Sequence, residues 1–294
     1  MQEKFYLIAD VYGMCGGVHA ALDLLEKLLV SPGGTVYVFH ELVHNRSVTE
    51  SFRRRGVIFA EKISDIPPGA TLVIGAHGVA PDVERELRRR AGICLDATCP
   101  LVKKLHRIAE ELIPEDELVI FGKSGHPEVT GTAGHSGTDK VFLISAPEEV
   151  GDLPPLRHPV FISQTTVDHG EVERTLALLR ERFPDLRECS GICEASRRRQ
   201  EAVIALSRQV DAVLVIGSAH SSNARRLREI AGRGGCAAFL IDNAGEITPE
   251  MLKFPRIGVT GGASTPQYLF DGVLEALRSA GYADGGRSAP PARS

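Results

Sequence analysis

The chain has 294 residues, of which 43% are hydrophobic and 24% are charged, an ordinary composition for a globular protein. A net charge of −4, an aromatic content of 5% and the absence of tryptophan argue against a general nucleic-acid or membrane-surface binder. Because no apolar run approaches the ~18 residues of a membrane helix and no secretory signal opens the sequence, we expect a cytoplasmic protein without nucleic-acid or membrane partners.

Short apolar runs alternate with amphipathic segments along the chain. Buried strands are predicted at 36–40, 71–75, 118–122, 159–163, 212–217 and 256–260. Helices are predicted at 19–29, 172–183 and 199–209. This alternation predicts an α/β fold in which helices cover parallel sheets. Three arginine triplets, at 53–55, 88–90 and 197–199, are expected to lie on solvated helix faces.

Three of the six cysteines share one context. Cys15, Cys99 and Cys193 each end an extended segment directly before a predicted helix, and they are 84 and 94 residues apart. Pro100 suits the first turn of a helix, where its missing N–H has no cost. Without a CxxC pair or a disulfide framework, metal or catalytic use is the better interpretation of these three. Cys94, Cys189 and Cys236 lack the helix start and are predicted to be structural.

Polar residues follow other strands at equivalent places, so that nine strand-to-helix junctions carry a reactive or polar side chain. We infer three α/β units of similar size at 15–98, 99–192 and 193–281, with an N-terminal strand within 1–14 joining the third. The strand ends are expected to converge on one centre in a pseudo-threefold arrangement, because ligands of open α/β sheets bind at the carboxyl ends of the strands. Residues 282–294, rich in Gly, Pro and Ser, are expected to form a disordered tail.

The junction residues suggest two kinds of chemistry. Three thiolates, favoured at helix N-termini, fit an iron–sulfur cluster with one open iron; small buried hydrophobes and a three-cysteine zinc site are the alternatives. An anion site for a diphosphate is predicted from the helix starts and three histidines, although each hydroxyl alone could be a helix N-cap. Its residues are His44, His77, His126, Ser221, Ser222, Asn223 and Ser264. Glu128 near Thr165 would form a proton relay; a surface salt bridge is the alternative for Glu128.

Together these residues resemble the IspH/LytB family of 4-hydroxy-3-methylbut-2-enyl diphosphate reductases. The matching stretches are GMCGGV, HELVHNRSV, AHGV, DATCPLVKKLH, GHPEVTGT, SQTT, ICEAS with RRQEA, SSN and GVTGGASTP, spread from Tyr6 to Leu277. The resemblance implies a three-lobed fold around a central [4Fe–4S] cluster held by Cys15, Cys99 and Cys193. It also implies a diphosphate held by the seven anion-site residues, with proton supply from Glu128 and orientation of the substrate hydroxyl by Thr165.

The implied reaction is reductive dehydroxylation of the allylic diphosphate to isopentenyl and dimethylallyl diphosphate, with two electrons from a ferredoxin or flavodoxin-type donor. The sequence departs from the family pattern at Ala20, Ser190, Ser196, Ala219 and His220, and two positive charges are lost with these changes. A diverged paralogue acting on a related allylic substrate therefore stays open. So do a hydratase-type iron–sulfur lyase, in which the iron is only a Lewis acid, and a redox sensor without turnover.

Overall fold

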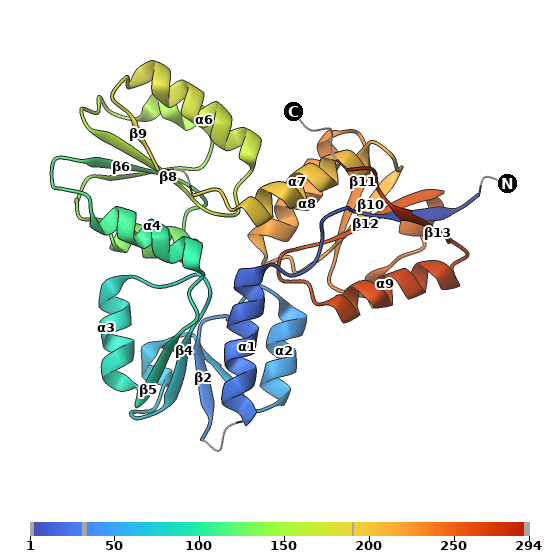
Figure 1. The fold of residues 1–294 in the computed structure, drawn as a ribbon, viewed down its shortest axis with the longest axis horizontal. Helices are drawn as coiled ribbons and strands as arrows, with labels where there is room; N and C mark the ends of the chain where they lie inside the picture. Colours follow the sequence, from blue (N-terminus) through green and yellow to red (C-terminus); the bar gives the residue numbers. More distant parts are fainter. Residues whose placement is uncertain (1–2, 31–33, 190, 291–294) are drawn as a thin grey trace. The chain divides into compact units, whose positions relative to one another are not determined.

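A computed structural model of the chain describes residues 3–30, 34–189 and 191–290. In this part of the chain, thirteen strands form three sheets in which all strand pairs are parallel, with helices between the strands (Figure 1). No described helix is long and apolar enough to span a membrane. The predicted α/β class is confirmed, and all six predicted strands and three predicted helices are present.

The chain divides into two compact bodies, each of which we describe by itself. The terminal body comprises Met1–Gly16, His44–Glu50 and Glu194–Ser294, and the middle body comprises Gly17–Val43 and Ser51–Cys193. The terminal body contains one sheet, and the middle body contains two. The boundaries predicted for three α/β units at 15–98, 99–192 and 193–281 stay a prediction.

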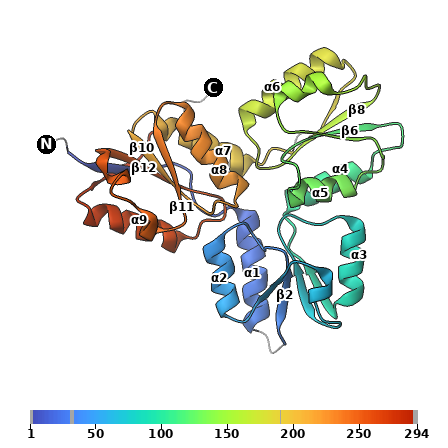
Figure 2. The ribbon, with the colours of Figure 1, turned by 180° about the vertical axis from the view of Figure 1, so that it is seen from behind.

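The five-stranded sheet of the terminal body is sandwiched between helices. Its strand order is β11 (Ala237–Ile241), β10 (Ala212–Ile216), β12 (Arg256–Gly261), β1 (Phe5–Ile8), β13 (Ala283–Arg287). Alternate side chains of β10 point to opposite faces. Leu214 and Ile216 pack in one cluster with α9 (Gln267–Ser279), whereas Val213 and Val215 pack with α7 (Glu194–Ser207) and α8 (Ser222–Arg233). The helices thus cover both faces, as Figures 1 and 2 show, and the carboxyl ends of the strands form one edge.

A four-stranded sheet in the middle body follows the first cysteine. Its order is β3 (Ile58–Ala60), β2 (Val36–Phe39), β4 (Thr71–Ile74), β5 (Ile93–Asp96). The helices of this stretch are α1 (Gly16–Val30), α2 (Arg46–Arg54) and α3 (Pro81–Arg90). Leu87 of α3 packs with Phe39, Leu72 and Ile74, so α3 covers one face of the sheet.

The other four-stranded sheet of the middle body follows Cys99. Its order is β7 (Val141–Ile144), β6 (Glu117–Phe121), β8 (Pro159–Ser163), β9 (Arg187–Glu188). Its helices are α4 (Pro100–Glu110), α5 (Pro127–Gly134) and α6 (His169–Arg182). Phe161 packs with α6, while Val160 and Ile162 pack with α4 and α5, so helices again cover both faces. Short 3₁₀ turns occur at Ile63–Asp65, Pro147–Asp152, Ala244–Glu246 and Met251–Lys253.

The C-terminal segment differs from the expected disordered tail. Residues 283–287 form β13, which pairs in parallel with β1 through Phe5↔Ala283 and Tyr6↔Asp284 before a register irregularity. Backbone hydrogen bonds order this exposed strand despite its glycines, because the edge of β1 offers unpaired backbone groups. Composition alone could not reveal that partner. Residues 291–294 lie outside the described residues.

Candidate functional site

The three junction cysteines lie directly at helix starts. Cys99 is the N-cap residue of α4, with Pro100 at the first helical position. Cys15 directly precedes α1, and Cys193 directly precedes α7. All three residues are partly exposed, as are Cys94 and Cys189. At the helix starts the positive end of the helix dipole favours the thiolate, the form that binds metals.

The other three cysteines have different surroundings. Cys94 lies within β5, Cys189 follows β9, and Cys236 is buried before β11. Burial raises the pKa of each of these three thiols above its ordinary value. A raised pKa disfavours the thiolate at these three positions, and the structural role expected for them stays a prediction.

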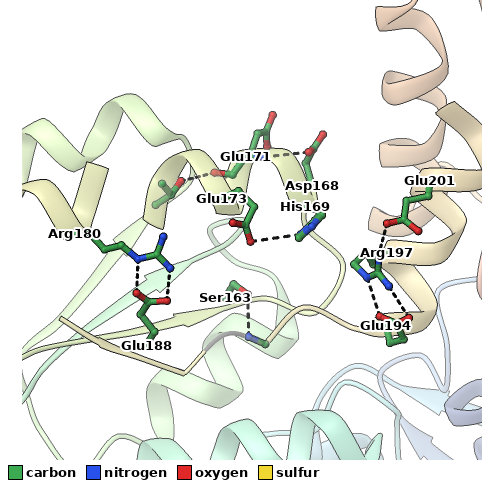
Figure 3. A network of polar contacts seen from close by, with 12 residues as sticks. Ser163, Asp168, His169, Glu171, Glu173, Arg180, Glu188, Glu194, Arg197 and Glu201 are labelled. Carbon is green, nitrogen blue, oxygen red and sulfur yellow. Dashed lines mark hydrogen bonds and ion pairs between the residues drawn. The ribbon is translucent and has the colours of Figure 1, made fainter. Parts of the chain in front are cut away.

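The loops that carry Cys99 and Cys193 are tied to strand ends of the middle body. The Cys99 N–H donates to the Ala76 carbonyl (3.0 Å), next to His77, and the Cys193 N–H donates to the Thr165 carbonyl (3.2 Å). His77 and His126 form an edge-to-face ring pair with centroids 5.6 Å apart. The loop before Cys193 is fixed further, because the Gly191 N–H donates to the Ser163 hydroxyl (3.1 Å; Figure 3).

Glu128 and Thr165 form a buried acid–hydroxyl pair. The Thr165 N–H donates to one carboxylate oxygen of Glu128 (2.6 Å), and the Thr165 hydroxyl donates to the other (2.9 Å). The relative exposure of Glu128 is only 2%, so the alternative of a surface salt bridge is wrong. Burial raises the pKa of Glu128 to about 7, against the opposing effect of the two hydrogen bonds.

His126 is the N-cap residue of α5, which places Glu128 in the first turn. Its Nδ1 accepts a hydrogen bond from the Glu128 N–H (3.2 Å). A neutral imidazole that accepts at Nδ1 carries its proton at Nε2. The His126 ring therefore holds the backbone N–H of Glu128 in the first turn of the helix.

In the terminal body, Cys15, Ser264 and His44 are connected through their loops. The Cys15 N–H donates to the Ala263 carbonyl (3.0 Å), and the neighbouring Ser264 hydroxyl donates to the His44 carbonyl (3.1 Å). Asn45 strengthens this connection: its side-chain amide donates to the Ser264 carbonyl (2.8 Å) and its side-chain oxygen accepts from the Val48 N–H. Sequence reasoning missed Asn45, although it follows His44 directly and can cap the next helix.

The start of α8 has the features of an anion site. Ser221 is the N-cap, and its hydroxyl accepts from the Ala224 N–H (3.3 Å). The Ser222 hydroxyl and the Asn223 side-chain nitrogen are buried without a hydrogen-bond partner in the described part of the protein. Gly262 lets the neighbouring loop approach this helix start, since a Cβ there would lie only 3.3 Å from the Ala224 Cβ. Buried unpaired donors are costly, and an anion at this helix start would satisfy both.

A cavity of about 470 Å³ lies beside Cys99 in the middle body. Thr98 and Pro100 line it, together with His106, whose ring stacks on His135 with centroids 4.0 Å apart. Burial and the neighbouring His135 lower the pKa of His106 to about 4, so this ring is neutral. Lys103, which also lines the cavity, pairs with Asp96 (2.6 Å). The Lys103 charge in this cavity is thus paired with a carboxylate, whereas the start of α8 has hydrogen-bond donors without a described partner.

One member of the arginine triplets is not on a solvated face. Arg53, Arg54 and Arg55 are exposed as expected, but Arg199 is buried, with a relative exposure of 4%. Its guanidinium donates to the Gly13 carbonyl through Nε (3.1 Å) and Nη2 (2.6 Å). The sequence pattern predicted one solvated face for the whole triplet 197–199. Arg197 and Arg198 do form surface ion pairs, but Arg199 does not share their setting.

The positions that depart from the family pattern differ in their burial. Ala20, Ala219 and His220 are exposed, so replacement of longer cations there leaves no cavity in the core. Ser196 is buried, and its hydroxyl lies 3.5 Å from the Asn223 side-chain oxygen. Ser190 lies outside the described residues.

The predicted site residues therefore fall into two local groups. The middle body brings together Glu128, Thr165 and the loop of Cys193, and it pairs His77 with His126. The terminal body links the loops of Cys15, Ser264 and His44, and it holds the start of α8. Within the described residues, no three His, Cys, Asp or Glu side chains are gathered closely enough to hold a metal ion; Cys15 belongs to one body and Cys99 and Cys193 to the other.

Fold and site together define an α/β protein with thiols, an acid–hydroxyl pair and anion donors at the carboxyl ends of parallel strands. The chain belongs to the LytB protein family, whose model matches residues 7–278. It is 44% identical over 280 residues to 4-hydroxy-3-methylbut-2-enyl diphosphate reductase 2 of Bradyrhizobium diazoefficiens, covering 93% of this chain and 91% of the relative. It is 40% identical over 291 residues to the reductase of Neisseria meningitidis serogroup C, covering 96% and 89%.

Solved structures agree with this assignment. The structure of E-1-hydroxy-2-methyl-but-2-enyl-4-diphosphate reductase from Plasmodium falciparum matches with a TM-score of 0.90 at 26% identity, covering 99% of this chain and 95% of that one. A structure titled as (E)-4-hydroxy-3-methyl-but-2-enyl diphosphate reductase, the terminal enzyme of the non-mevalonate pathway, matches with a TM-score of 0.67 at 29% identity. It covers 94% of this chain and 99% of that one. The predicted family is confirmed.

Proposed function

We propose that this protein is a 4-hydroxy-3-methylbut-2-enyl diphosphate reductase of isoprenoid biosynthesis. The reaction takes two electrons and two protons, breaks the allylic C–O bond, and releases water with isopentenyl or dimethylallyl diphosphate. The observation that carries the proposal is the buried Glu128–Thr165 pair, hydrogen-bonded beside Cys193 in a chain of the LytB family. Full-length similarity to relatives named for this activity supports it.

Cys15, Cys99 and Cys193 are the residues that would hold a [4Fe–4S] cluster. The donor set fits, because three thiols at helix starts favour the thiolate, whereas the three other cysteines have raised pKa values. When bound, such a cluster supplies an open iron for the substrate hydroxyl and a path for two electrons. A ferredoxin or flavodoxin-type protein would be the electron donor, and the cytoplasm would be the compartment.

Glu128 would be the proton source of the reaction. A pKa of about 7 keeps a large fraction of the carboxyl protonated near neutral pH, and this is the condition under which an acid both holds and gives up a proton readily. Thr165 would orient the substrate hydroxyl and pass the proton on, since its own hydroxyl is within hydrogen-bond distance of the acid.

The diphosphate would be bound by two groups of donors. In the terminal body these are Ser221, Ser222, Asn223, Ser264 and His44, of which Ser222 and Asn223 have buried donors without a described partner. In the middle body they are His77 and His126, the latter with its proton on Nε2. Binding of the distant diphosphate would fix the allylic end of the substrate next to Glu128 and Thr165.

The experiment that tests the function is an anaerobic assay with cluster-reconstituted protein, 4-hydroxy-3-methylbut-2-enyl diphosphate and reduced methyl viologen. Substrate-dependent bleaching, with isopentenyl and dimethylallyl diphosphate as products, is the expected result. Protein that carries its cluster but shows no bleaching would favour a diverged paralogue for another allylic substrate. Turnover without any reductant would instead favour the hydratase-type lyase.

A further inference from the structure

A buried arginine joins two junctions of the terminal body. Arg199 lies in the second turn of α7, the helix that begins directly after Cys193. Its guanidinium donates to the Ala195 carbonyl through Nη1 (2.6 Å) and to the Gly13 carbonyl through both other nitrogens. Gly13 stands two residues before Cys15. One side chain thus reaches from the helix that follows one candidate iron ligand to the loop that carries another.

The loop before Cys15 has two other ties, both to the same neighbouring loop. The Gly13 N–H donates to the Gly261 carbonyl (3.4 Å), and the Cys15 N–H donates to the Ala263 carbonyl (3.0 Å). Gly13 has a φ of +76°, a conformation suited to glycine. The Gly261–Ala263 loop therefore fixes one side of the Cys15 loop, while Arg199 fixes the carbonyl that points toward α7.

The energetics indicate that the position is not chosen for stability alone. Removing a guanidinium from water is costly, and hydrogen bonds offset that cost only when their geometry is good. An apolar side chain would fill the same helix face without this cost. The neighbouring Arg197 illustrates the cheaper arrangement, with surface pairs to Glu194 and Glu201 (Figure 3). What Arg199 adds is geometry, because its planar fork bonds the Gly13 and Ala195 carbonyls at once in fixed directions.

We propose that Arg199 is a positioning residue for the iron site, which holds the Cys15 loop in place relative to the start of α7. The inference rests on the proposed role of Cys15 and Cys193 as iron ligands. It makes Arg199 an outer support of the ligand loop, of the kind whose loss weakens metal binding about 10–100-fold.

The test compares Arg199→Gln, Arg199→Lys and the control Arg198→Gln. Arg198 is the adjacent arginine of the same helix, but its side chain is 63% exposed and pairs with Glu194 (2.7 Å). We expect Arg199→Gln to lose iron to a ferrous chelator about tenfold faster than the wild type. Arg199→Lys keeps the charge without the fork and should behave like Arg199→Gln, whereas Arg198→Gln should match the wild type.

A second measurement needs neither iron nor turnover. In iron-free protein, amide hydrogen exchange at residues 13–17 should rise about tenfold in Arg199→Gln, the effect of losing roughly one strong hydrogen bond. The exchange of the α9 amides serves as the internal control for global unfolding. Arg199→Lys is the second variant for both measurements if the Gln variant does not fold.

Three results would overturn the inference. The first is that Arg199→Gln retains iron as well as the wild type does. The second is that Arg199→Lys retains iron as well as the wild type does, because this would show that the charge of residue 199 matters and its fork does not. The third is unchanged exchange at 13–17 despite faster iron loss. A wild-type protein that binds iron without turnover would end the proposed reaction, but iron release in the variants would still decide the role of Arg199.

Discussion

The hydroxyl and the backbone N–H of Thr165 both donate to the carboxylate of Glu128, at 2.9 and 2.6 Å, inside the middle body. Two hydrogen bonds normally lower the pKa of a carboxyl group, yet burial outweighs them here and raises it to about 7. The pair thus holds a proton close to neutral pH, at the loop that leads to Cys193.

Replacing Glu128 by glutamine is expected to lower the turnover rate by about 10²–10⁴-fold, because the amide keeps the shape but cannot donate the proton. Iron content and the KM for the substrate should change little. Anaerobic viologen kinetics measure this, with the exposed Glu173→Gln as the matched control. A near-wild-type rate in Glu128→Gln would remove Glu128 from the acid role.

The same substitution should change how stability depends on pH. Since the pKa of Glu128 is about 7 when folded and 4.5 as its ordinary value, the folded state binds more protons between these pH values. Wild-type stability therefore falls as pH rises from 4.5 through 7, by about 3 kcal/mol in total for this group. Glu128→Gln should lack this decline. Denaturant unfolding at pH 5 and pH 8 measures the difference, and parallel curves for the two proteins would contradict it.

Cys99→Ser is expected to lose most of its bound iron, because a serine hydroxyl at this helix start does not replace a thiolate ligand. Cys94→Ser, five residues earlier in β5, should retain iron, since burial raises the pKa of that thiol. Iron per chain and the visible absorbance of reconstituted proteins provide the measurement. Equal iron contents in the two variants would show that another residue is the ligand.

The two adjacent serines at the start of α8 should separate stability from binding. Ser221→Ala removes the N-cap bond to Ala224 and should destabilise the protein by about 1 kcal/mol. Ser222→Ala removes a hydroxyl without a described partner, so stability should hold while affinity for inorganic diphosphate falls about tenfold. Thermal unfolding measures the stability of both variants, and competition of inorganic diphosphate with the substrate measures its affinity. If Ser222→Ala lowered stability and left the affinity for diphosphate unchanged, the anion would bind elsewhere.

Much of the site could be predicted because its residues occupy local sequence contexts. Cys15, Cys99 and Cys193 stand between an apolar run and an amphipathic segment, and each does lie at a helix start. Pro100 marks the first position of α4 as its fixed backbone angle predicts. The central strands could also be predicted from the sequence, since buried parallel strands are continuous apolar runs.

Other features could not be predicted from the sequence, because a local sequence pattern does not show which residues far along the chain become contact partners. The glycine-containing segment 283–287 is a strand only because the edge of β1 is available. Arg199 looks like its surface neighbours until Gly13, 186 positions away, is brought to it. Asn45 finds Ser264 at a separation of 219 residues.

The sequence by itself determined the α/β class, the family and the identity of the candidate thiols, acid and anion donors, because these depend on residue type and periodicity. The tertiary structure decided which of these groups are buried and what they touch. It removed Glu128 from water and set Thr165 against it, which raised the pKa of the acid, and it left the Ser222 and Asn223 donors inside the protein without a described partner. Desolvation is a property of packing between distant segments, and no local run of residues encodes it.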